Sequence, residues 1–147
     1  MDEPDLTTPS AYQHWVTEHV RFSDTDLVGH VNNVAIAAFV ESGRVAYAGQ
    51  LLASTRAGHG LTLRRVEIDY LRELHYPATL QVGSRLLAIG RTSLTVGTGV
   101  FADARCVATA RAVLVAVGPD GSVPLADEAR HVLEAELPVA GAEDTPA

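Results

Sequence analysis

Residues 33–53, NVAIAAFVESGRVAYAGQLLA, are the stretch that decides the fold. They contain no proline and many alanines, which predicts one long helix. Apolar side chains such as Ile36 and Phe39 are spread around most of the helical circumference. A helix that is apolar on nearly all sides must be enclosed by other parts of the protein. The polar residues Glu41 and Arg44 mark where it reaches an interface, a pocket or solvent.

The stretches on either side of this helix have the alternation typical of β-strands. Residues 15–22 fit a strand ahead of the helix, and Val66, Ile68 and Tyr70 alternate with acidic residues beyond it. Three further strands are predicted, separated by turn-like residues: 79–89, 92–102 and 106–117. Connections this short join antiparallel strands. We therefore expect an α+β fold in which a curved antiparallel five-stranded sheet wraps around the central helix.

The length and composition fit one domain. A chain of 147 residues with an apolar fraction of 47% has enough material for one core. We predict a flexible N-terminus over residues 1–13, a single domain over 14–137 that closes with a short helix at about 126–136, and a disordered tail over 138–147.

Charge and hydropathy exclude several classes of function. The formal net charge of −7 disfavours nucleic-acid binding, although all eleven basic residues are arginine, which suits phosphate contacts. No stretch of about 18 or more apolar residues is present, and the first ten residues are acidic, so we expect no membrane association and a cytoplasmic protein. A single cysteine, Cys106, offers neither an internal disulfide nor a cysteine-pair metal site.

The predicted strand over residues 106–117 is apolar on both faces. Val113 and Val115 alternate with Leu114 and Ala116, which is typical of a strand that is covered on both sides. The central helix covers one face of the sheet only, so we predict that a second subunit covers the other face in a homodimer.

The chemistry is expected in DTDLVGHVNN, residues 24–33, immediately ahead of the helix. A carboxylate is a base or a nucleophile, and the free N–H groups of a first helical turn stabilise a developing negative charge. The same residue types also favour turns and helix caps, and Gly29 fits a tight bend. His30 either orients the substrate or closes the loop. We assign no metal to His30, because no partner ligands occur at helical or hairpin spacing.

These motifs resemble the hotdog-fold acyl-CoA thioesterases of the 4-hydroxybenzoyl-CoA thioesterase type, over about residues 15–133. VRFSDTDLVGHVNN, followed by Glu41 and Arg44, is similar to the family's Asp-x-Asp-x-x-Gly-His-x-Asn-Asn block and downstream Glu-x-x-Arg. VEIDYLREL resembles its Tyr-x-Arg strand, and AIGRTSLTV its Gly-x-x-Ser turn. The chain departs from the family at Ile36, where tyrosine is common, and at Glu73, where proline is commoner.

The resemblance implies hydrolysis of acyl-CoA to free acid and coenzyme A, with no cofactor beyond the coenzyme A of the substrate. It assigns the catalytic carboxylate to Asp26 and an oxyanion-binding N–H to about Asn33, with His30 as a third candidate. An ionised aspartate either attacks the carbonyl or orients water, and the sequence leaves both routes open. The resemblance also implies a homodimer or a homotetramer made of two such dimers. Asp24 is assigned a supporting role in the turn.

Further positions are predicted to bind the substrate: Gly29, Asn32, Ile36, Phe39, Glu41, Arg72, Arg91, Thr92 and Ser93. Arginines and backbone donors suit the phosphates of coenzyme A, with residues 91–93 as the first candidate and Arg72 as the next. Ile36 and Phe39 favour an aliphatic acyl group.

Two rival functions share the same fold. A hotdog domain can bind acyl-CoA without cleaving it, and such a module has no need of an ionised carboxylate at the scissile carbonyl. A hotdog dehydratase needs a histidine paired with the acid on a differently placed loop and helix, which the block at residues 24–33 does not obviously supply.

Overall fold

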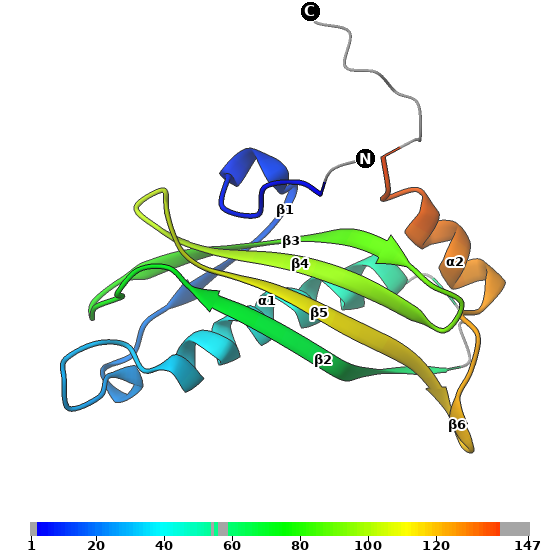
Figure 1. Ribbon diagram of the computed structural model, residues 1–147, viewed down its shortest axis with the longest axis horizontal. Helices are drawn as coiled ribbons and strands as arrows, with labels where there is room; N and C mark the ends of the chain where they lie inside the picture. The colour runs from blue at the N-terminus through cyan, green and yellow to red at the C-terminus, as the bar shows by residue number, and fades with distance from the viewer. Residues whose placement is uncertain (1–2, 54, 56–58, 139–147) are drawn as a thin grey trace, which may run out of the picture.

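A long helix lies against one face of a curled antiparallel sheet (Figure 1). The structure is a computed structural model, and it describes residues 3–53, 55 and 59–138. The helices are α1, Asn33–Leu52, and α2, Asp127–Glu134, with short 3-10 helices η1, Pro9–Ala11, and η2, Phe22–Asp24. The strands are β1, His14–His19; β2, Gly60–Tyr70; β3, Thr79–Ile89; β4, Ser93–Ala102; β5, Arg105–Gly118; and β6, Gly121–Ser122. The predicted helix–sheet arrangement is confirmed, with the short β6 as an additional strand.

The strands follow the order β1-β3-β4-β5-β2, and β6 pairs with β5. Strands β3, β4 and β5 form a meander whose turns lie where the sequence predicted them. β2 departs from that simple order, because it pairs with β5 rather than with β3. The connection at residues 71–78 carries the chain across the end of the sheet, where Leu71 N–H donates to Val107 O at 2.9 Å. This connection later forms one wall of the candidate site.

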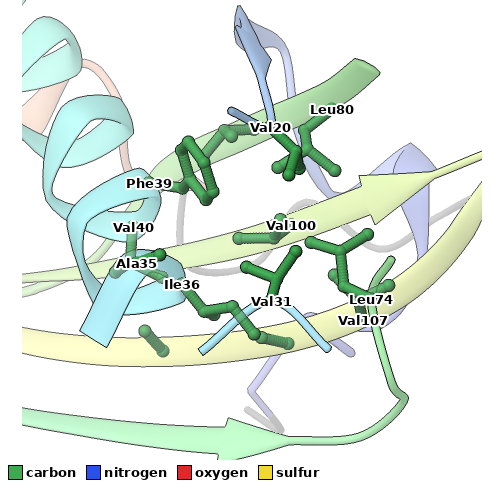
Figure 2. Packing of buried hydrophobic residues seen from close by; sticks show 13 residues of the cluster. Val20, Val31, Ala35, Ile36, Phe39, Val40, Leu74, Leu80, Val100 and Val107 are labelled. Carbon is green, nitrogen blue, oxygen red and sulfur yellow. The ribbon is translucent and has the colours of Figure 1, made fainter. Parts of the chain in front are cut away.

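The first half of α1 packs into the main core. Phe39 and Val40 lie among Leu80 and Val100 from the sheet, together with Val20 ahead of the helix (Figure 2). Each of these side chains is at most 6% exposed. Burial of such side chains stabilises the folded state by about 1.5 to 3 kcal/mol each. The packing fixes the helix start relative to the sheet.

The N-terminal segment contributes to the core, which differs from our expectation. Tyr12 is only 5% exposed and packs edge-on against Trp15 and Phe101. It lies over the glycine pair Gly83 and Gly99, which are register partners on β3 and β4. Side chains at these two positions would collide with Tyr12, so the glycines leave the room that the aromatic ring occupies. The sequence of residues 1–13 lacks periodicity, so it did not reveal this anchor; residues 139–147 of the predicted tail lie outside the described part of the chain.

One side of α1 remains uncovered in the single chain. Val34 and Val45 are 80% and 61% exposed, so the expected enclosure of the helix is incomplete. The far face of β5 was expected to need a second subunit as cover, but Thr109 and Val115 on that face are already buried within the single chain. The helix is therefore the more exposed surface, while Val113 and Val117 on the far face of β5 are half-buried. In the described part of the chain, no helix is both long and apolar enough to cross a membrane.

Candidate active site

Asp24 holds the loop between β1 and α1 in place. Its carboxylate accepts hydrogen bonds from Arg21 N at 2.8 Å and Arg21 Nη2 at 3.1 Å. Its carbonyl oxygen accepts from both the backbone N and the Nδ2 of Asn32, at 2.8 Å each. Burial disfavours the charged form of Asp24, but the hydrogen bonds from Arg21 outweigh burial and hold the pKa of this carboxyl below its ordinary value. These contacts support the structural role assigned to Asp24.

Asp26 lies two residues further on, at an exposed turn. Its Oδ1 accepts hydrogen bonds from Val28 N at 2.9 Å and His30 N at 3.3 Å. Gly29 has a φ of 85°, a left-handed conformation that glycine adopts without a steric penalty. Within the described residues, Asp26 Oδ2 accepts no hydrogen bond. One oxygen therefore holds the turn, while the other is available to a substrate or a water molecule.

The start of α1 presents free backbone donors beside this turn. Asn32 is the N-cap, and its side chain accepts from Ala35 N at 2.7 Å. The backbone N–H groups of Asn33 and Val34 have no acceptor among the described residues, as expected for a first helical turn. Tyr70 on β2 donates its hydroxyl to Asn33 O at 3.2 Å and so ties the helix start to the sheet. The arrangement can stabilise an oxyanion.

A pocket of about 290 Å³ joins the turn to the helix start. Five of the residues predicted to be catalytic or to bind the substrate line this pocket: Asp26, His30, Asn33, Ile36 and Arg72. It also includes Tyr70 and Glu73, which the sequence had linked to the family pattern but not to the site. A larger pocket of about 710 Å³ lies beside Tyr47 and Arg85 and contains none of the carboxylates of the turn. The chemistry therefore points to the smaller pocket.

Residues 91–93 lie at the other end of the molecule. Arg91 and Thr92 lie in the turn between β3 and β4, and Ser93 begins β4; Arg91 O accepts from Leu125 N at 2.9 Å beside α2. The loop that contains Asp26 lies by the opposite end of β3, where Thr79 pairs with His19 (Figure 1). The helix between the two ends is 20 residues long, or about 30 Å at 1.5 Å per residue. A single chain does not bring Arg91, Thr92 or Ser93 to Asp26.

Four further candidates do not line the pocket: Gly29 of the turn, the N-cap Asn32, Phe39 and Glu41. Phe39 is 6% exposed and belongs to the core, so it does not line the pocket as predicted. Glu41 is exposed and forms an ion pair with the buried Arg44 at 3.6 Å. Glu41 and Arg44 both line a separate groove of about 660 Å³ between α1 and β2. Their intrahelical pairing agrees with their spacing of about one turn.

His30 has neighbours that the sequence analysis missed. Its Nε2 lies 3.3 Å from Glu73 Oε2, and the same oxygen lies 3.7 Å from His75 Nε2. The expectation of no metal at His30 rested on spacing along the sequence alone, and the structure brings two potential ligands from another segment beside it. They belong to the connection between β2 and β3, so neither helical nor hairpin spacing reveals them.

The family follows from a comparison with known proteins. The family model of the thioesterase-like superfamily matches residues 20–133, which include the loop, α1 and the sheet from β2 onward. The chain belongs to the thioesterase-like superfamily. This membership and the similarity to solved thioesterase structures confirm the expected hotdog fold.

Two solved structures illustrate the similarity to this superfamily. A thioesterase from Thermus thermophilus, solved in complex with coenzyme A and Zn, is 33% identical with a TM-score of 0.74, over 82% of this chain and 92% of that chain. A predicted thioesterase from Bacillus stearothermophilus is 26% identical with a TM-score of 0.74, over 84% and 95% of the two chains. Uncharacterized protein YsmA of Bacillus subtilis (strain 168) is 32% identical over 92 residues, 57% of this chain. That match spans 63% of YsmA, under two thirds of its length.

Proposed function

We propose that this protein hydrolyses acyl-CoA thioesters to a free acid and coenzyme A. The observation that carries the proposal is the shared pocket of Asp26 and the start of α1 at Asn33. An exposed carboxylate and free N–H donors are the two elements that thioester cleavage requires. The thioesterases among the similar structures, one of them bound to coenzyme A, support the same substrate class.

Asp26 acts by one of two routes. As a nucleophile, Oδ2 attacks the carbonyl carbon, the thiolate of coenzyme A leaves and takes up a proton, and water then hydrolyses the mixed anhydride. As a general base, the carboxylate takes a proton from water as that water attacks the carbonyl carbon; the tetrahedral intermediate then expels the thiolate of coenzyme A, which takes up the proton. In both routes, the N–H groups at Asn33 donate to the carbonyl oxygen as it becomes anionic. His30 and Tyr70 line the same pocket and help to orient the thioester.

We assign the protein to the 4-hydroxybenzoyl-CoA thioesterase type of hotdog enzyme. Within that type, we propose that its own substrate carries an aliphatic acyl group. Ile36 is 3% exposed and forms an apolar part of the lining beside the chemistry. Where the acyl group contacts this isoleucine, an aliphatic chain buries no polar group, whereas a hydroxyl placed there would lose its hydrogen bonds to water. Thiol release from acyl-CoA substrates of increasing length, with 4-hydroxybenzoyl-CoA in parallel, tests both the reaction and this preference.

A binding module without catalysis is the alternative. It is favoured by the hydrogen bonds from Val28 N and His30 N to Asp26, because a residue that only holds the turn would make the same contacts. Tight binding of acyl-CoA with no thiol release from any substrate would favour this alternative.

Arg72 is now the preferred contact for the phosphates of coenzyme A, because it lines the pocket of Asp26 and Arg91 does not. Arg72→Gln should raise the Michaelis constant for acyl-CoA by about tenfold or more, since a charged hydrogen bond contributes about 1.5 to 3 kcal/mol. The Michaelis constant for a short thioester without the nucleotide should hardly change. Arg91→Gln is the matched control. An effect of Arg91→Gln alone would place the phosphates at the opposite end of α1.

We also propose a homodimer or homotetramer that covers the exposed side of α1. Val34 and Val45 are apolar and largely exposed, and a second subunit would remove both from water. Light scattering at micromolar concentration should give at least twice the chain mass of 15.6 kDa. Val45→Glu should shift the protein toward a single chain. A monodisperse wild-type species of 15.6 kDa would rule the assembly out.

A further inference from the structure

We propose that His30, Glu73 and His75 bind a transition-metal ion of the zinc class at the edge of the pocket. The ligand atoms of the three side chains all lie within 4.8 Å of one another. Glu73 Oε2 is central, at 3.3 Å from His30 Nε2 and 3.7 Å from His75 Nε2. Two imidazoles and one carboxylate form a donor set that zinc binds readily.

The distances suit a tetrahedral ion. Bonds of about 2.0 to 2.1 Å place two ligand atoms of a tetrahedral site about 3.4 Å apart. The two separations from Glu73 are already close to that value. The ring centroids of His30 and His75 are 5.0 Å apart, and their ligand nitrogens, which lie within 4.8 Å of each other, have to turn toward a common point. The side chains of Glu73 and His75 are 67% and 60% exposed, so rotamer changes at the surface allow this approach.

The backbone fixes one of the ligands in advance. His30 N–H donates to Asp26, and His30 O accepts from Asp26 N at 2.9 Å, so the loop holds His30 in place. Glu73 and His75 come from the connection between β2 and β3, and a bound ion would link these two segments. Three protein ligands leave a fourth position for water. The ion would lie beside the pocket that contains Asp26, because His30 and Glu73 both line it.

Metal titration of the full-length, tag-free protein tests the site without any substrate. Co²⁺ should produce the visible absorption bands of a tetrahedral ion with one ion per chain, and Zn²⁺ should displace it. Zn²⁺ should also raise the thermal midpoint, because it binds the folded state. His75→Gln and Glu73→Gln should each weaken binding by about tenfold or more. His131→Gln, which changes an exposed histidine of α2, should leave the affinity unchanged.

The results separate this proposal from thioester hydrolysis. Wild-type protein that binds neither ion at millimolar concentration would overturn the metal site, as would an affinity that both His75→Gln and Glu73→Gln leave unchanged. An equal loss in His131→Gln would also overturn it. Circular dichroism of each variant shows whether it is folded. If one of the two ligand variants does not fold, the other still tests the site. Thiol-release activity does not enter the readout, so either proposal can fail alone.

Discussion

Asp26→Asn should lower turnover by at least about a hundredfold, while the affinity for acyl-CoA and the thermal midpoint change little. Asparagine keeps the shape of the side chain and an oxygen that accepts from Val28 N and His30 N. It removes the charge that either chemical route requires. Thiol-release kinetics, equilibrium binding of acyl-CoA and thermal unfolding measure the three quantities on one protein preparation.

Asp24→Asn is the matched control for Asp26. It should cost less activity and more stability, because Asp24 is buried and bonded to Arg21. Near-normal turnover in Asp26→Asn would show that the chemistry lies elsewhere. A greater loss of turnover in a folded Asp24→Asn protein would show that the other carboxylate carries it. An unfolded Asp26→Asn protein would instead identify Asp26 as a structural residue of the turn.

Gly43→Ala should lower the free energy of unfolding by about 1 to 2 kcal/mol, although alanine is the better helix former. Gly43 lies where α1 crosses β3, and a Cβ there would lie 2.5 Å from Val82 Cγ1. Val82 is fully buried, so the helix has to move away from the sheet or the valine has to leave its rotamer. Urea unfolding with linear extrapolation measures the change.

Gly49→Ala in the same helix is the control for Gly43→Ala. Gly49 is exposed, and a Cβ there would have no neighbour within 4 Å. Its replacement should raise the free energy of unfolding by up to about 1 kcal/mol through helix propensity alone. Opposite signs at the two glycines would establish the close approach of α1 to β3. Equal stabilisation of both variants would contradict it.

Local periodicity explains what the sequence predicted well. The helix expected over residues 33–53 is α1, Asn33–Leu52, and the strand expected over 79–89 is β3, Thr79–Ile89. The loop ahead of α1 was also a local prediction, because its turn and cap residues are neighbours in the chain. The structure places Asp26 and Asn33 in one pocket as expected, although their catalytic roles stay predictions.

Long-range pairing explains what the sequence did not predict. No local pattern predicts that β2 pairs with β5, and this pairing brings the connection at residues 71–78 to the loop that contains Asp26. Glu73 and His75 were therefore not expected beside His30. The same limit applies to Arg91. Its turn resembles a family motif, but it lies at the far end of β3 from the loop that contains Asp26. A resemblance to a motif does not show which end of a long strand the residue occupies.

The contact between Tyr12 and the glycine pair Gly83 and Gly99 limits which substitutions these three positions accept. Gly83 and Gly99 leave a bare strip on the sheet, and the ring of Tyr12 fills it. A larger residue at either glycine expels the tyrosine, and a smaller residue at position 12 exposes the strip to water. Neither change is tolerated easily alone. We expect these three positions to be exchanged together among relatives, so that their covariation would trace which lineages carry this N-terminal cover.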